Sequence, residues 1–360
     1  MKKNYLFLAL LCALVTTTVF TSCNDDDNDS WREGSRIEMP KYRAFVLCEG
    51  MYGMNDSRLT FVDPAQDTIY QHDVFETQNG MKLGDTANDI ICYDGDIYII
   101  MNGSEVLYRL NGSGVLQAQY NGFKADGLGS PRYIAATEGK LYVTCYGGFV
   151  ARFDAKTLAL EAKVKVDANP EEIEIVGTKA YCVCSGWGYG NTICSIELTS
   201  FNESVSSETL ANPAGLKYSD GNMYVLSAGT YNEDWSYATY PCVATYDMTN
   251  NTTEKIADAS RVCAVDDKLY IVECNHTPHT YSIYNAHARN ITEWNLTGMP
   301  DEFNTQTVYM IEHNPYDGTF YIATTDYVSN SIIYHFNANG QYIGKFSAEG
   351  INANSMVFLK

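Results

Sequence analysis

Apolar and polar positions alternate along most of the chain in short runs, which is the pattern of half-buried β-strands. A unit recurs in these runs: a turn residue, an apolar residue, a tyrosine and two or three further strand-forming residues. It reads DIYII, KLYVT, KAYCV, NMYVL, KLYIV and TFYIA, with tyrosines at Tyr98, Tyr142, Tyr181, Tyr224, Tyr270 and Tyr321. No helical period is found beyond the first 22 residues, so the pattern predicts an all-β protein.

The spacing of the repeated tyrosines identifies the architecture. Successive tyrosines are 44, 39, 43, 46 and 51 residues apart by their numbers, close to the period of roughly 40 to 50 residues of propeller blades. Each unit has room for four strands; around Tyr142 they read RYIAAT, KLYVTCY, FVARFD and ALEAKVKV. We interpret the tyrosines as packing residues between blades, with no role in binding.

The two ends of the chain complete one further blade. Residues 351–360 hold one strand, SMVFL, while residues 42–48, 58–62 and 68–75 hold three strands with no inner partner. Pairing the C-terminal strand with the N-terminal three closes the ring and removes exposed edges. The sequence therefore predicts a seven-bladed β-propeller with four antiparallel strands per blade.

The N-terminus reads as a targeting segment. Lys2 and Lys3 precede a short apolar run, and Phe20-Thr21-Ser22-Cys23 resembles the lipobox at which bacterial lipoproteins are cleaved and lipidated on cysteine, although phenylalanine replaces the usual aliphatic residue. The alternative is an ordinary secretory signal with a chance cysteine. We expect a signal peptide at 1–22, a lipidated acidic tether at 23–40 that starts with Cys23, and a propeller at 41–360. This predicts an outer-membrane lipoprotein that faces the cell exterior.

The net charge excludes some classes of ligand, and the positions of the cysteines indicate how they pack. Without Lys2 and Lys3 the chain keeps 22 basic residues against 44 acidic ones, a net charge of −22, so nucleic acid and anionic lipid are poor ligands. Cys12 leaves with the signal and Cys23 would carry lipid, which leaves nine of the 11 cysteines. Most of the nine, including Cys92, lie in apolar runs where we expect them to pack as small hydrophobic residues.

Long loops between the second and third strands of the units share an unusual composition. In a propeller these loops gather on one face around the central channel. They read EGMYGMNDS, NGS, YGG, SGWGYGN, AGTYNEDWSYATYP, CNHTPH and TDYVSN, rich in Gly, Asn, Tyr and Trp. This composition predicts a broad face for a large neutral ligand with a planar apolar body and amide or hydroxyl groups at its edge. The alternative is that the aromatic side chains only stiffen the loops.

Signals for catalysis are weak. His276 and His279 have metal-compatible spacing but no identifiable third ligand. Glu171 and Glu172 are adjacent on a strand and point to opposite faces, so they make no acid–base pair by spacing. Nucleophile-elbow, P-loop and dinucleotide motifs are absent from the sequence. We therefore expect a binding protein, not an enzyme, with no metal and no catalytic cofactor.

The runs AFVLCEGMYGMNDSRLTFVDP, LGDTANDIICYDGDIYIIMNGS, SPRYIAATEGKLYVTCYGG and NPEEIEIVGTKAYCVCSG resemble the surface-exposed, cobalamin-binding propeller lipoproteins of the BtuG type, within the YncE-like or surface-layer propeller group. The resemblance implies capture of cobalamin or a related corrinoid outside the cell and delivery to a TonB-dependent outer-membrane transporter. From the matching blocks it implies contacts at Glu49, Gly50, Asn55, Asp85, Asn88, Asp89, Asn102, Arg132 and Tyr146.

The loops contribute further candidates of this chain's own. The ligand-binding residues predicted from the loops and the resemblance together are Glu49, Tyr52, Asn55, Asp85, Asn88, Asn102, Arg132, Tyr146, Trp187, Tyr189, Tyr231, Trp235, Tyr237, His276 and Tyr327. Two other functions compete with corrinoid binding. A propeller of this composition suits a glycan or a protein partner at the cell surface, and a lactonase- or lyase-like enzyme would need a metal or acid–base cluster at the channel mouth.

Overall fold

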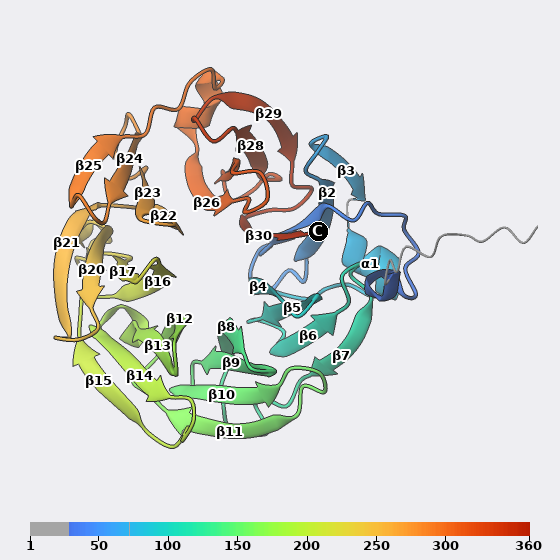
Figure 1. The fold of residues 1–360 in the computed structure, drawn as a ribbon, viewed down its shortest axis with the longest axis horizontal. Coiled ribbons are helices and arrows are strands. Elements are labelled where there is room, and N and C mark those ends of the chain that lie inside the picture. Colours follow the sequence, from blue (N-terminus) through green and yellow to red (C-terminus); the bar gives the residue numbers. More distant parts are fainter. Residues whose placement is uncertain (1–28, 72) are drawn as a thin grey trace, which may run out of the picture.

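A computed structural model describes residues 29–71 and 73–360; the expected signal peptide and Cys23 lie outside them. Seven four-stranded antiparallel sheets are arranged as a ring around a central channel (Figure 1). The predicted seven-bladed, all-β propeller is confirmed. No helix among the described residues is long and apolar enough to cross a membrane.

Each blade runs from an inner strand at the channel to an outer strand at the rim of the ring. We number the blades one to seven from β4 onward. Blades one to three comprise β4 (Ala87–Tyr93), β5 (Asp96–Met101), β6 (Val106–Leu110), β7 (Leu116–Tyr120); β8 (Pro131–Thr137), β9 (Lys140–Cys145), β10 (Phe149–Asp154), β11 (Leu160–Lys165); and β12 (Pro170–Val176), β13 (Lys179–Cys184), β14 (Thr192–Glu197), β15 (Ser204–Glu208). Blades four to six comprise β16 (Pro213–Ser219), β17 (Asn222–Ser227), β20 (Cys242–Asp247), β21 (Thr252–Asp258); β22 (Arg261–Val265), β23 (Lys268–Glu273), β24 (Thr280–Asn285), β25 (Asn290–Glu293); and β26 (Thr307–His313), β27 (Phe320–Thr325), β28 (Ile332–Phe336), β29 (Tyr342–Ser347).

Blade seven is shared by the two ends of the chain, as predicted. Its strands from the channel outward are β30 (Ala353–Leu359), β1 (Arg43–Cys48), β2 (Arg58–Asp63) and β3 (Thr68–Gln71). β30 pairs with β1 in antiparallel register, with Phe45 opposite Val357 and Val46 opposite Met356. The closure leaves no unpaired edge between the first and last strands of the ring.

One part of the N-terminal prediction is wrong. The third strand ends at Gln71, and Val74 and Phe75 lie in a short helix, α1 (Val74–Asn79). The Asp73 carboxylate accepts a hydrogen bond from the Glu76 amide and caps this helix. Phe75 packs on Tyr108 with ring centroids 5.1 Å apart, so the helix fills the groove between blades seven and one.

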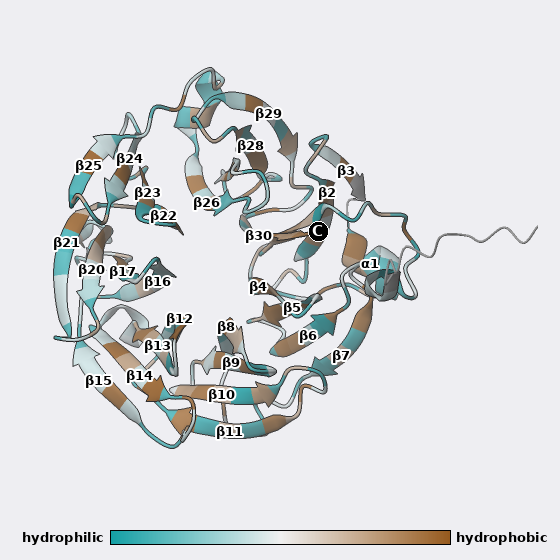
Figure 2. Ribbon diagram, viewed as in Figure 1, coloured by the Kyte–Doolittle hydropathy of each residue, from teal (hydrophilic) through white to brown (hydrophobic). Residues whose placement is uncertain are grey.

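The repeated tyrosines pack between blades, as predicted. Tyr98 of blade one joins the core cluster that contains Leu141 and Phe153 of blade two, and its hydroxyl donates to the Ala155 carbonyl. Tyr181, Tyr224, Tyr270 and Tyr321 hold the corresponding places in the following seams. Apolar residues form bands along the strands of the blades, and polar residues occupy many of the connecting loops (Figure 2).

The segment before β1 also packs on the propeller. Trp31, in the 3₁₀ helix η1 (Asp29–Arg32), lies over the guanidinium of Arg43, with Cζ 3.6 Å from the ring centroid. Arg43 is buried, which lowers its pKa to about 10, and it donates to the carbonyls of Gly112 and Lys41. Gly112 lies in the turn from β6 to β7. The segment is therefore attached to the face opposite the loops that join second and third strands.

None of the nine cysteines in the described part of the chain forms a disulfide. Seven of them are buried, as the packing interpretation predicts. Cys92 departs from the packing interpretation because it is exposed. It lies near the end of β4, where this strand lines the channel.

Candidate functional site

The long loops occupy one face of the propeller because the second strand of every blade runs in the same direction along the channel. They follow β1, β5, β9, β13, β17, β23 and β27, and they lie beside the first residues of the inner strands. We call this the loop face. The longest loop, in blade four, forms a small hairpin of its own from β18 (Thr230–Tyr231) and β19 (Tyr237–Thr239).

Exposed aromatic side chains gather on the loop face. Tyr189 is 96% exposed, Tyr52 84%, Trp235 83% and Trp187 69%. Tyr231, Tyr240 and Tyr327 are about half exposed and lie on loops of the same face. Large aromatic surface left in water by a folded protein is available to a partner or ligand. We call these seven side chains the aromatic rim.

The hairpin in blade four organises part of the rim into a row of rings. Tyr231 stacks on Tyr237 with centroids 4.8 Å apart, Tyr237 contacts Tyr240 at 5.1 Å, and Trp235 lies 6.4 Å from Tyr231. His276 of blade five extends the row, 4.5 Å from Tyr240. The Tyr237 hydroxyl donates to Asn275 of the same blade-five loop. The rings therefore form a continuous surface across two blades.

A hydrogen-bonded ion pair lies at the mouth of the channel in blades two and three. The Arg132 guanidinium is 2.9 Å from the Glu171 carboxylate, which also accepts from the hydroxyls of Tyr146 and Ser185. Arg132 donates to the Asn88 side chain as well. Tyr146 is held against this pair by a tight loop, since a Cβ on Gly147 would lie 2.3 Å from the Leu128 carbonyl oxygen. Trp187 packs edge-on against Tyr146 at 5.4 Å.

A second polar group stands across the mouth. The Glu49 carboxylate accepts from the Tyr309 hydroxyl at 2.5 Å, and burial raises the pKa of Glu49. Tyr309 packs edge-on against Tyr327 of the rim, and Arg261 lies over the Tyr309 ring. This arrangement presents hydrogen-bond acceptors and donors to a ligand, beside exposed aromatic rings.

Several predicted residues shape the loops. Asp85 accepts hydrogen bonds from the Gly53 amide and the Thr86 hydroxyl, which hold the first loop against blade one. Asn102 donates to the Pro131 carbonyl. Asn55 is exposed in a left-handed conformation, with φ of 54°. Asp85 and Asn102 are engaged with the backbone, whereas Tyr52 in the same first loop is free to meet a ligand.

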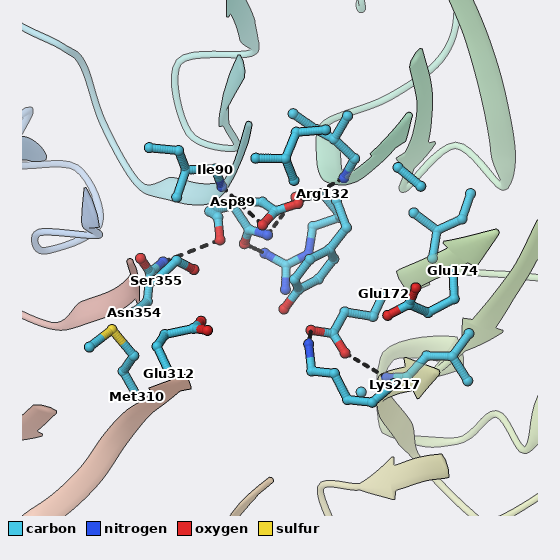
Figure 3. A pocket seen from close by; sticks show the side chains of 18 of the residues that line it. Asp89, Ile90, Arg132, Glu172, Glu174, Lys217, Met310, Glu312, Asn354 and Ser355 are labelled. Atoms are coloured by element: carbon cyan, nitrogen blue, oxygen red, sulfur yellow. Dashed lines mark hydrogen bonds and ion pairs between the residues drawn. The ribbon is translucent and has the colours of Figure 1, made fainter. Parts of the chain in front are cut away.

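The channel holds a cavity of about 800 Å³ that extends from the mouth residues Glu49 and Arg132 to Cys92 at the end of β4, and an unexpected acidic cluster lines it. Figure 3 shows Asp89, Glu172, Glu174 and Glu312 around one ammonium group, that of Lys217, which lies 2.6 Å from Glu172. Burial, reinforced by the neighbouring carboxylates, raises the pKa of Asp89, Glu174 and Glu312 to about 7. Burial works to lower the pKa of Lys217, but Glu172 and Glu174 outweigh it and raise that pKa.

Glu171 and Glu172 serve separate groups, as expected: one holds Arg132 and the other Lys217. A β-bulge between Pro170 and Ile173 gives the strand one extra residue at this point. Within the described residues no three His, Cys, Asp or Glu side chains are placed to hold a metal ion. The His279 Nδ1 is buried without a partner, and burial lowers the pKa of that side chain.

Five residues of the site were not predicted from the sequence: Arg261 and Tyr309 at the mouth, and Glu174, Lys217 and Glu312 in the channel. A signal for the last three was present. Glu174, Lys217 and Glu312 pair directly with the repeated tyrosines Tyr181, Tyr224 and Tyr321. Paired residues on neighbouring strands point to the same side of a sheet, so these three side chains lie in the seams of the repeated tyrosines, at the innermost strand that lines the channel.

The fold and the loop face together define a class: a seven-bladed β-propeller with one aromatic face. No family profile matches the chain, and no curated protein matches its sequence. Solved structures share the fold. A Bacteroides fragilis protein described as a candidate 6-phosphogluconolactonase has a TM-score of 0.57 and 12% identity over 89% of this chain and 98% of its own. Citrobacter koseri AztD has a TM-score of 0.52 and 12% identity, with the same coverage.

Another propeller, the dihydro-heme d1 dehydrogenase NirN in complex with DHE, has a TM-score of 0.54 and 10% identity over 89% of this chain and 76% of its own. At these identities the likeness establishes the fold.

Proposed function

We propose that this chain is a cell-surface lipoprotein that binds cobalamin or a related corrinoid on its loop face and passes it to a TonB-dependent outer-membrane transporter. The observation that carries the proposal is the aromatic rim beside a hydrogen-bonding channel mouth. A corrinoid is a broad, nearly planar ring fringed with amides. Exposed rings such as Trp235 match its faces, and the Glu49, Asn88 and Arg132 groups match its amide edge.

The proposal describes a binding protein without catalysis. Arg132 and Glu171 neutralise each other, and the four channel carboxylates surround a lysine below the mouth. A ligand resting on the rim contacts the mouth from above. Cys23 is the proposed site of lipidation, and the lipid would hold the protein in the outer membrane.

Isothermal titration calorimetry of the mature chain with cyanocobalamin tests the proposal. We expect 1:1 binding, and we expect Trp235→Ala or Tyr237→Ala to weaken it about 10- to 100-fold, because exposed aromatic anchors carry most of the energy of such interfaces. Tyr316→Ala is the matched control, since Tyr316 is a half-exposed aromatic on the opposite face. Absence of heat with both cyanocobalamin and aquocobalamin at micromolar protein would refute corrinoid binding.

A glycan or protein ligand is the competing function, because aromatic side chains on an exposed face also suit sugar rings. Binding of an oligosaccharide that Trp235→Ala abolishes, with no response to cyanocobalamin, would establish it. A gene neighbourhood of polysaccharide enzymes without a corrinoid transporter would point the same way.

A further inference from the structure

We propose that His276 is a metal ligand: its Nε2 coordinates the metal centre of the bound corrinoid in place of an axial water. The inference rests on the proposed function, and it adds the chemistry by which one form of the ligand is preferred. His276 belongs to the row of rings on the loop face, 4.5 Å from Tyr240, so a planar ligand lying on that row would pass over it.

The imidazole of His276 is arranged as a metal-binding histidine is. Its Nδ1 lies 3.3 Å from the carboxylate of Glu273, a residue that is only 7% exposed. A carboxylate behind one ring nitrogen holds the proton there and leaves the lone pair on the other nitrogen. The His276 side chain is 50% exposed, so a ligand on the loop face can reach it.

Glu273 is itself fixed. It is the last residue of β23, and its carboxylate accepts the Asn275 amide at 2.7 Å. Asn275 in turn accepts from Tyr237 and donates to Ser260. The same loop therefore links the orientation of His276 to the rings that would support the ligand. His279 is unsuited to this role, because its Nδ1 is buried without a partner.

The step is a ligand exchange with no redox change. The cobalt–oxygen bond of the coordinated water breaks, water leaves, and neutral imidazole Nε2 forms the new bond to cobalt(III). The proton on Nδ1 stays between His276 and Glu273. Cyanide is held far more firmly than water, so cyanocobalamin should bind without this exchange. The protein should therefore prefer aquocobalamin to cyanocobalamin.

The experiment is spectroscopic titration of the mature protein with each form. With aquocobalamin we expect the visible bands to move to those of a reference made from aquocobalamin and free imidazole; with cyanocobalamin we expect no band shift. His276→Ala should abolish the shift, and it should weaken the binding of aquocobalamin at least about tenfold more than it weakens the binding of cyanocobalamin. Glu273→Gln should weaken aquocobalamin binding about 10-fold or more.

His287→Ala is the matched control, because His287 is 72% exposed in a turn of the same blade, between β24 and β25. It should behave like the unmodified protein. Binding of both forms with no shift, or a shift that survives His276→Ala, would overturn the assignment and leave corrinoid binding intact. Failure of both forms to bind would instead refute the proposed function.

Discussion

Replacement of Glu171 by alanine is expected to lower the free energy of unfolding by about 3–5 kcal/mol, because it leaves the largely buried Arg132 guanidinium without its countercharge. Glu171 also accepts from Tyr146 and Ser185, so the change removes the links from β12 to β8 and to the loops after β9 and β13 at once. Urea unfolding followed by far-UV circular dichroism measures it as a lower midpoint.

Two further variants show whether the loss of stability comes from the unpaired buried charge. Glu254→Ala removes the partner of Arg289 in an exposed pair between β21 and the turn before β25, and it should cost no more than about 1 kcal/mol. The double variant Arg132→Met/Glu171→Leu should recover much of the loss, since it leaves neither charge buried. A Glu171→Ala midpoint equal to that of Glu254→Ala would show that the mouth pair contributes little to stability.

The stability of the propeller is expected to fall as the pH rises from about 4 to 7. The pKa values of Asp89, Glu174 and Glu312 are raised to about 7 in the folded protein, whereas in the unfolded chain such carboxyls titrate near 4. Across that interval the folded state holds more protons, and each carboxyl contributes a loss of at most about 1.4 kcal/mol per pH unit. Below the pKa values of the unfolded chain the three carboxyls make their full contribution to stability. Above pH 7 they no longer change the free energy of unfolding as the pH rises.

Glu312→Gln tests this contribution directly. The amide mimics the protonated carboxyl, so the variant should be more stable than the parent at pH 8 and should show a shallower decline between pH 5 and 7. Glu293→Gln removes the same charge from an exposed position on β25 and serves as the control for overall charge. Equal pH profiles for Glu312→Gln and the parent would contradict the raised pKa of Glu312.

The fold was predictable from the sequence because each blade repeats the same packing problem. A tyrosine such as Tyr98 or Tyr142 fills six of the seven seams, and its recurrence at blade-length spacing indicates the ring without any distant contact. The shared blade was predictable because a lone strand and three partnerless strands complete each other. Helix α1 was missed because its six residues carry too little periodicity to distinguish a strand from a helix.

The site was only partly predictable, for a geometric reason. Loop composition placed Trp187, Tyr189 and Trp235 on one face, since topology alone fixes which side a loop takes. Which side chains meet at the channel depends on register and on bulges in the inner strands, such as those after Ala87 and Pro131. A bulge shifts every following side chain by one position, and no local signal in the sequence marks it.

The stacking of Trp31 on Arg43 has a bearing on how the molecule stands relative to a membrane. Five residues lie between Cys23 and Asp29, so the six steps from one to the other reach at most about 22 Å. A lipid on Cys23 would thus tether the propeller by the underside of blades seven and one, with the ring of Tyr and Trp turned toward the medium. This orientation would suit capture of a ligand from solution. Transfer of the ligand to a pore in the same bilayer would require the Trp31 contact to break and the propeller to rotate until its loop face points toward the membrane.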